Sequence, residues 1–224
     1  MNKQFSLILM ILTAVMCILH LSDIYNDGKK TAEKASAVYD EKIVAITFDD
    51  GPRKSSTTML LDGLKERDVV ATFFVVGENV ECNKELIKRM DEEGHMVCNH
   101  TYTHTDLSKL EKDAALIEIN KTNELIEDIT GNRPAYIRPP GGAWDEKIFF
   151  EVDMTPVFWN VDPSDWKRND VDGIVRDVVN STKDGSIILL HDIYDTSVAA
   201  AFEIIDRLKD KGYIFVTVDE ILIS

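Results

Sequence analysis

The chain has 224 residues, of which 44% are hydrophobic and 29% are charged. This composition is enough to build a folded core and excludes a disordered tail, and three cysteines are too few for a small disulfide-stabilised scaffold. Lys and Arg number 25 against 40 Asp and Glu, so the net charge is −15. An acidic surface repels phosphate backbones, so we expect no nucleic-acid partner.

The chain opens with an almost wholly apolar run over residues 5–21. The run is short for a helix that spans a bilayer and long for the apolar part of a signal peptide. We interpret residues 1–21 as a signal peptide or membrane anchor and the polar residues 22–40 as a tether. Residues 35–37, Ala-Ser-Ala, fit the small-x-small pattern of a signal-peptide cleavage site but lie well beyond the apolar run. Retention of the protein in the membrane and its release after cleavage are therefore both possible outcomes. The folded domain is expected over residues 41–224.

From residue 42 onward, short apolar runs rich in β-branched residues alternate with stretches of helical spacing. Strands separated by helices predict a parallel α/β fold, either an open doubly wound sheet or a barrel. The expected strands are 43–48, 69–76, 96–99, 135–138, 156–161, 186–190 and 213–218. The expected helices are 56–67, 83–93, 110–130, 145–152, 171–180 and 198–211, with a last turn over 219–223.

The chain's rarest polar residues directly follow the predicted strands. Parallel α/β folds gather their sites at the carboxyl ends of the strands, so these residues are expected to converge. Their coincidence at five strand ends predicts an enzyme. In strand order they are Asp49 and Asp50, then His100 and His104, then Arg138, Gly141 and Gly142, then Asp162, Asp165 and Trp166, and then His191 and Asp192.

His100 and His104 are four residues apart, a spacing that places two imidazoles on one face of a helical turn. The carboxylate of Asp50 would complete a set of two histidines and one acid, which leaves positions open for water and substrate. The set predicts one divalent metal ion, zinc first and cobalt, nickel, manganese or iron as alternatives. Taken alone, the His pair and the acidic turn also fit ordinary structural roles.

His191 ends an apolar strand, where it could be a third metal ligand, a general acid or a buried structural residue. Asp165 and Asp192 are both candidates to orient it and to raise its pKa. Arg138 does not give up its charge, so it is a poor acid and a good counter-ion for a carboxylate. His95, in contrast, follows a predicted helix and is expected to be a surface histidine. The two cysteines of the domain could form a disulfide, but we expect unpaired thiols.

With these residues assembled, the chain resembles the polysaccharide deacetylases of the NodB-homology type, carbohydrate esterase family 4. The similarity extends over about residues 42–224 and depends on five motifs in a fixed order. The motifs T-F-D-D-G, H-[ST]-x-x-H, R-P-P-x-G, D-x-x-D-W and L-x-H correspond here to Thr47–Gly51, His100–His104, Arg138–Gly142, Asp162–Trp166 and Leu189–His191. The resemblance implies a distorted (β/α) barrel with about seven parallel strands.

The resemblance also implies a role for each site residue. Asp49 corresponds to the general base, which pairs with Arg138, and His191 corresponds to the general acid, which Asp165 orients. The other positions are the metal ligands Asp50, His100 and His104, the oxyanion donor Gly141 N–H, and Trp166 and Leu189 as walls of the acetyl-methyl pocket. The chain departs from the family at Gly141, where an aromatic residue is common, and at Thr105, where proline is common.

The activity implied by this resemblance is removal of acetyl groups from N-acetylated sugars of an extracellular polysaccharide, with release of acetate. Peptidoglycan is the leading substrate, and chitin oligomers and acetylated xylan are alternatives. Two rivals come from other classes, namely an inactive glycan-binding relative and a metal-dependent phosphodiesterase. We expect a monomer outside the cytoplasm that is either secreted or held at the membrane by residues 1–21.

Overall fold

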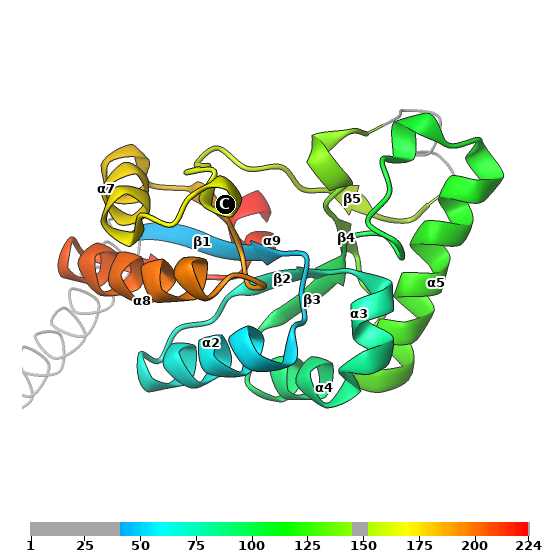
Figure 1. Cartoon of the computed structure of the whole chain (residues 1–224), viewed down its shortest axis with the longest axis horizontal. Coiled ribbons are helices and arrows are strands. Elements are labelled where there is room, and N and C mark those ends of the chain that lie inside the picture. Colours follow the sequence, from blue (N-terminus) through cyan, green and yellow to red (C-terminus); the bar gives the residue numbers. More distant parts are fainter. Residues whose placement is uncertain (1–40, 145–151, 224) are drawn as a thin grey trace, which may run out of the picture. The chain divides into compact units, whose positions relative to one another are not determined.

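The computed structural model describes residues 41–144 and 152–223. Within them, seven parallel strands form one sheet that curls into a half-barrel with helices around it (Figure 1). The path β5-β4-β3-β2-β1-β6 runs across the sheet, and β7 pairs with β1. The predicted α/β barrel of about seven parallel strands is therefore confirmed. The strands are β1 (Lys42–Asp49), β2 (Thr72–Val75), β3 (Met96–Asn99), β4 (Tyr136–Ile137), β5 (Thr155–Pro156), β6 (Ser186–His191) and β7 (Tyr213–Phe215).

β1 is the central strand, because it pairs with three others. Its edge toward β6 is paired from Val44 to Asp49. Its opposite edge pairs with β7 over the first residues, Lys42–Val44, and with β2 over the last residues, Thr47–Asp49. The carboxyl end of β1 thus lies between β2 and β6, in the middle of the sheet.

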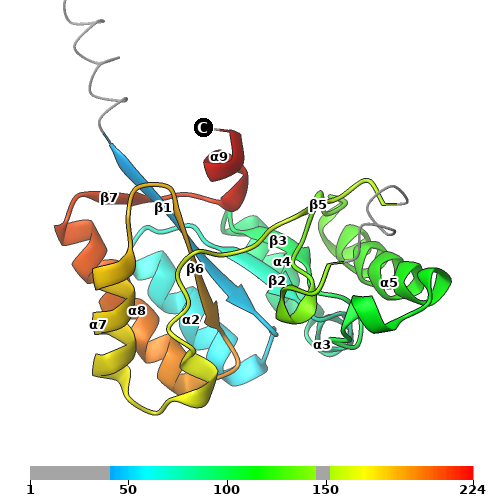
Figure 2. The ribbon, with the colours of Figure 1, turned by 90° about the horizontal axis from the view of Figure 1, so that it is seen from above.

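Five helices form a continuous layer around the sheet, because each packs against the next in the order α7, α8, α2, α4 and α5 (Figure 2). The short helix α3 (Gly77–Cys82) packs against α5 and α4, and α9 (Val218–Ile223) packs against β1 and β6. The five helices are α2 (Lys54–Glu66), α4 (Lys84–Glu92), α5 (Lys112–Thr130), α7 (Val171–Ser181) and α8 (Asp195–Asp210). The described residues also include the 3-10 turns η1 (Leu107–Lys109), η2 (Pro140–Gly142) and η3 (Asp165–Lys167).

Side chains of the central strands alternate between two cores. Val44, Ile46 and Phe48 of β1 belong to the large core that includes the helices, whereas Ala45 belongs to a smaller cluster inside the half-barrel. Cys98 of β3 and Ile187 of β6 belong to the same inner cluster. Successive side chains of a strand point to opposite faces. Residues that lie two or four positions after Ala45, Cys98 and Ile187 therefore face the interior of the half-barrel as well. These interior residues are Thr47, Asp49, His100, Leu189 and His191.

The predicted strand over 156–161 is wrong in its extent. β5 ends at Pro156, although Val157 N–H still donates to the carbonyl oxygen of Ile137 in β4 at 2.8 Å. The chain then leaves β4 and reaches β6, where Asn160 N–H donates to Ile187 and Val161 forms an isolated bridge with Ile188. Between these points, Arg138 donates hydrogen bonds to the carbonyl oxygens of residues 157 and 158, at 3.3 and 3.4 Å. A buried guanidinium therefore satisfies carbonyls that a neighbouring strand would satisfy in a longer ladder.

Two other expectations are also corrected. The helix expected over 83–93 is preceded by a further helix, α3, that the sequence did not predict. His95 is not a surface residue, because only 6% of it is exposed and its Nδ1 accepts a hydrogen bond from Ala71 N–H at 3.1 Å. Burial lowers the pKa of His95 to about 4, so the ring is neutral at pH 7.

Several predictions concern residues that the structure does not describe. The signal or anchor over 1–21, the tether over 22–40 and nearly all of the helix expected over 145–152 belong to this group. Among the described residues, no helix combines the length and the hydropathy needed to cross a bilayer. Cys82 is exposed and Cys98 is buried, and both are unpaired in the structure.

Candidate active site

Asp49 is the last residue of β1 and is almost fully buried. Its Oδ1 lies 2.8 Å from Nη1 of Arg138, and the same nitrogen donates to Oγ1 of Thr47 at 2.7 Å. The Arg138 guanidinium has no exposed surface and also stacks over the ring of Phe74, 4.1 Å from its centroid. The fixed charge of Arg138 therefore compensates a carboxylate that would otherwise be buried without a counter-ion.

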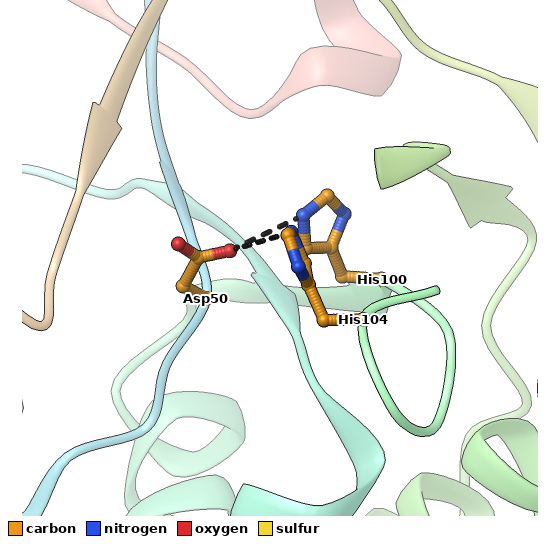
Figure 3. Close-up of side chains that lie close together, drawn as sticks. All are labelled: Asp50, His100 and His104. Atoms are coloured by element: carbon orange, nitrogen blue, oxygen red, sulfur yellow. Dashed lines mark ion pairs between the residues drawn. The ribbon is translucent and has the colours of Figure 1, made fainter. Parts of the chain in front are cut away.

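Asp50 follows directly in the chain but has a different environment. Its backbone is left-handed, with φ of 74°, and its Oδ1 lies 3.4 Å from Nε2 of His100 and 3.1 Å from Nε2 of His104 (Figure 3). Nδ1 of His100 is 2.6 Å from the carbonyl oxygen of Arg138. Because a carbonyl only accepts, Nδ1 carries a proton, so Nε2 is the ring nitrogen available to bind a metal ion together with Asp50.

The His pair comes together through a loop rather than through the helical turn that its spacing predicted. His100 follows β3 directly, and the next residues form no helix. Thr101 and His104 have left-handed backbones, with φ of 65° and 56°. This tight loop brings the centroids of the two imidazole rings to 5.0 Å from each other. The predicted proximity of the two histidines is therefore present, but a loop and not a helical turn produces it.

One nitrogen from each histidine and one oxygen of Asp50 lie within 4.8 Å of one another. Two donors bound to one zinc ion at tetrahedral angles are roughly 3.3–3.6 Å apart, close to the 3.1 and 3.4 Å found here. The neighbouring Asp49 adds a second carboxylate, and Arg138 supplies only one fixed positive charge. Donor types, spacing and excess negative charge all fit one divalent cation.

His191 is the last residue of β6 and is the register partner of Asp49 on the neighbouring strand. Its Nδ1 lies 2.8 Å from Oδ1 of Asp165, and its backbone N–H donates to Oδ2 of the same carboxylate at 2.9 Å. Burial works to lower the pKa of His191, but the hydrogen bond and charge of Asp165 outweigh burial, with the charges of Asp49 and Asp50 in support. The pKa is thereby raised to about 9.

Asp192, the other candidate to orient His191, has a different environment. It is fully buried, and Oγ1 of Thr57 donates a hydrogen bond to its Oδ2. It packs against Gly51 so closely that a Cβ at that position would come within 2.2 Å of both carboxylate oxygens. Of the two candidates, the structure therefore places Asp165, and not Asp192, against the His191 ring. Burial raises the pKa of Asp192 to about 7.

Asp49, Asp50, His100, His104 and His191 face a common cavity of about 360 Å³, and Arg138, Asp165 and Asp192 are not among its lining residues. Gly141 lies on its wall in a turn whose hydrogen bonds are donated by Gly142 and Ala143, so the turn does not use the N–H of Gly141. A Cβ at Gly141, whose φ is +63°, would meet no atom within 4 Å, so there is open space beside this residue. Sequence reasoning missed Trp159 and Tyr194, for which no motif gave a signal. The lining residues are Asp49, Asp50, His100, His104, Gly141, Trp159, Asp162, Trp166, Leu189, His191 and Tyr194.

Comparison with known proteins agrees with this arrangement. The family model for polysaccharide deacetylases matches residues 37–155. Over 181 residues, or 81% of this chain, the sequence is 44% identical to the peptidoglycan-N-acetylmuramic acid deacetylase PdaC of Bacillus subtilis. It is 41% identical over 180 residues, or 80% of the chain, to the peptidoglycan-N-acetylglucosamine deacetylase PgdA of Listeria monocytogenes. The chain belongs to the polysaccharide deacetylase family, the NodB-homology type that its motifs resemble.

Solved structures show the same fold. The structure of Bacillus subtilis PdaC aligns with a TM-score of 0.80 at 44% identity and covers 82% of this chain and 91% of that one. A family 4 acetyl xylan esterase from Clostridium thermocellum, in complex with cobalt, aligns with a TM-score of 0.77 at 35% identity and covers 81% and 90%. The curated sequences are longer, because the match covers only 39% of PdaC and 39% of PgdA.

Proposed function

We propose that this domain is a metal-dependent hydrolase that removes acetyl groups from N-acetylated sugars of an extracellular polysaccharide and releases acetate. One observation carries the proposal. Asp49 and His191, each with an opposite charge beside it, are register partners at the carboxyl ends of neighbouring strands, and they face the same cavity as Asp50, His100 and His104. Peptidoglycan is the first candidate substrate, because both longer relatives described above are named as peptidoglycan deacetylases.

Asp49 and His191 would divide the proton transfers between them. Asp49 accepts the proton of the attacking water, and Arg138 stabilises its carboxylate. His191 is protonated at neutral pH because its pKa is raised to about 9, and Asp165 orients its ring. His191 then protonates the departing nitrogen, which is needed because an amine anion is a poor leaving group. Base and acid are thus distinct groups whose environments differ in the sign of the neighbouring charge.

The remaining residues bind and orient the substrate. A divalent ion held by Asp50, His100 and His104 would polarise the acetyl carbonyl and make a water molecule more acidic. The Gly141 N–H can donate to the developing oxyanion, a contribution of about 3 kcal/mol per donor in other enzymes. Buried Leu189 and half-exposed Trp166 supply apolar surface for the acetyl methyl group. Donor chemistry favours zinc, and cobalt is the alternative, since the related acetyl xylan esterase has been solved with that ion.

The proposal is tested by acetate release from peptidoglycan, N-acetylated chitin oligomers and acetylated xylan, each with and without a chelator. We expect release from peptidoglycan that the chelator abolishes and added zinc or cobalt restores. Preference for chitin oligomers would change the substrate and keep the amide hydrolysis. Preference for acetylated xylan, whose acetyl groups are O-esters, would contradict the proposed action on N-acetylated sugars. Undiminished release from metal-free, chelator-treated protein would exclude the metal-dependent mechanism. Binding of glycan without acetate release would support an inactive relative.

We also propose that the domain acts outside the cytoplasm and that residues 1–21 export it or anchor it in the membrane. The apolar run over 5–21 and the polar stretch over 22–40 support this location. Cell fractionation followed by protease treatment of intact cells tests it. Intact protein in the membrane, accessible to protease, indicates an anchor, whereas a mature chain that starts after residue 37 indicates release. Protein confined to the cytoplasm would contradict the proposal.

A further inference from the structure

The loop that carries the two histidines has an unfavourable backbone. Thr101 and His104 both lie in the left-handed region, at φ of 65° and 56°, where a Cβ is strained. His104 is also half exposed, with 49% of its side chain accessible, so core packing does not hold it. A loop of this kind keeps its shape only when contacts from neighbouring elements hold it.

The first residues of α3 bind two carbonyl oxygens of the loop. The backbone N–H groups of Gly77 and Glu78 donate to the carbonyl oxygens of Thr101 and Tyr102, each at 3.0 Å. The approach is close, because a Cβ at Gly77 would come within 2.4 Å of the Tyr102 ring. The start of the loop is held by Asn99, whose Oδ1 accepts from Thr101 N–H at 2.7 Å.

The other side of the loop is held by one side chain of α5, Glu118. Its Oε2 accepts hydrogen bonds from the backbone N–H of Tyr102 at 3.0 Å and of Thr103 at 2.8 Å. Its Oε1 lies 3.1 Å from Oγ1 of Thr103, which donates to it. A carboxylate that accepts three bonds is a strong anchor, because hydrogen bonds to charged groups are stronger than those between neutral groups. Glu118 thus fixes the two residues that immediately precede His104.

We propose that Glu118 is a positioning residue for the metal site, and the inference depends on the metal-dependent function proposed above. Glu118 is not among the residues that line the cavity, and it does not belong to the Asp50, His100 and His104 cluster. It acts through the backbone of residues 102 and 103, which sets where the imidazole of His104 lies relative to His100. Groups that orient metal ligands in this way raise affinity by about 10–100-fold.

The test compares Glu118→Ala with Glu118→Gln and with Glu124→Ala. The amide oxygen of Gln can accept both backbone N–H bonds, and its NH₂ group can donate to Oγ1 of Thr103, so this variant should keep the loop in place. Glu124 is an exposed residue of the same helix, so its replacement makes the same change of charge without touching the loop. For each protein the dissociation constants of zinc and cobalt are measured by competition with a chromophoric chelator. The melting temperature of the metal-free protein is measured separately.

We expect Glu118→Ala to bind zinc about 10–100-fold more weakly than the unsubstituted chain, while Glu118→Gln and Glu124→Ala bind it nearly as well. A changed visible spectrum of the cobalt-loaded Ala variant should accompany the loss. If Glu118→Ala binds zinc with an unchanged dissociation constant and differs only by a lower melting temperature, the inference is overturned and the proposed function is left intact. If the unsubstituted chain binds neither ion, both proposals fail. If Glu118→Ala does not fold, Glu118→Asp is tested in its place. We expect this variant to bind zinc more weakly to the same extent, and an unchanged zinc affinity would overturn the inference.

Discussion

The two halves of the candidate site are held in different ways. Asp49 and His191 end paired strands, are opposite each other in the sheet register and each contact a buried ion partner. Asp50 and His104 instead lie in left-handed backbone beyond the strands, and His104 is half exposed. Strand register and buried charge therefore position the proposed acid–base half, whereas hydrogen bonds from α3 and α5 position the loop of the proposed metal-binding half. Substitutions in the first half should affect turnover and folding, and those in the second should affect metal affinity.

The largest expected effect is on turnover in Asp49→Asn. This variant removes the proposed base and leaves the three candidate metal ligands in place, so acetate release should fall about 10²–10⁴-fold while zinc stoichiometry is kept. Acetate release and metal content of the same preparation are the two measurements. Loss of zinc from Asp49→Asn would mean that the roles of Asp49 and Asp50 are exchanged and that the division between the two halves is wrong.

The next largest effect is on folding stability in Arg138→Ala. Removal of this guanidinium leaves the Asp49 carboxylate buried without its ion partner, which costs about 3–5 kcal/mol in comparable cases. Arg133→Ala is the matched control, because Arg133 forms an ion pair with Glu127 in which both side chains are nearly half exposed. That pair should contribute at most about 1 kcal/mol. Urea unfolding of both variants checks the difference, and equal losses would contradict a special role for buried charge in the acid–base half.

Asp165→Asn should shift the pH dependence of the reaction. Asp165 raises the pKa of His191, so a neutral amide should lower that pKa by about one unit or more. In the proposed mechanism the rate requires protonated His191, so the rate should fall at a lower pH in the variant than in the unsubstituted chain. Profiles of kcat against pH from 6 to about 10 provide the measurement. An alkaline limb that stays in place would show that another group is the acid.

The smallest effect on folding is expected for His104→Ala, although this variant should lose its metal. Its side chain is half exposed and lies outside the packed core, so the metal-free protein should change in stability by only about 0.5–1 kcal/mol. Unfolding in the presence of chelator measures this, and elemental analysis measures bound zinc. A large loss of stability in the metal-free protein would show that the loop contributes to the fold as much as the strands do.

Much of the site could be predicted from the sequence because the strand ends are local features. The apolar runs Ile43–Phe48 and Ile187–Leu190 are each followed directly by a polar residue, Asp49 and His191. Parallel strands bring their carboxyl ends together, so these polar residues lie close to each other. Five motifs then placed Asp49, His191 and the other candidates, and the structure brings most of them to one cavity. Arg138 and Asp165 do not line it and are instead the buried partners of Asp49 and His191. Predictions about residues 1–40 remain predictions, since they lie outside the described residues.

The sequence by itself determined most of the order of strands and helices, the parallel α/β class and most of the residues that meet in the cavity, because periodicity and motif spacing are local properties of the chain. The barrel was implied by the resemblance of its motifs to a known family. The residues alone left Asp165 and Asp192 open as partners of His191, the motif resemblance implied Asp165, and the structure has Asp165 at the His191 ring. Only the tertiary structure decided that β5 ends at Pro156, that His95 is buried and that Glu118 holds the histidine loop. Each of these depends on contacts between residues far apart in the chain or on burial by several elements at once. Such contacts leave no pattern in a short window of sequence, so a correct local interpretation contains no information about them.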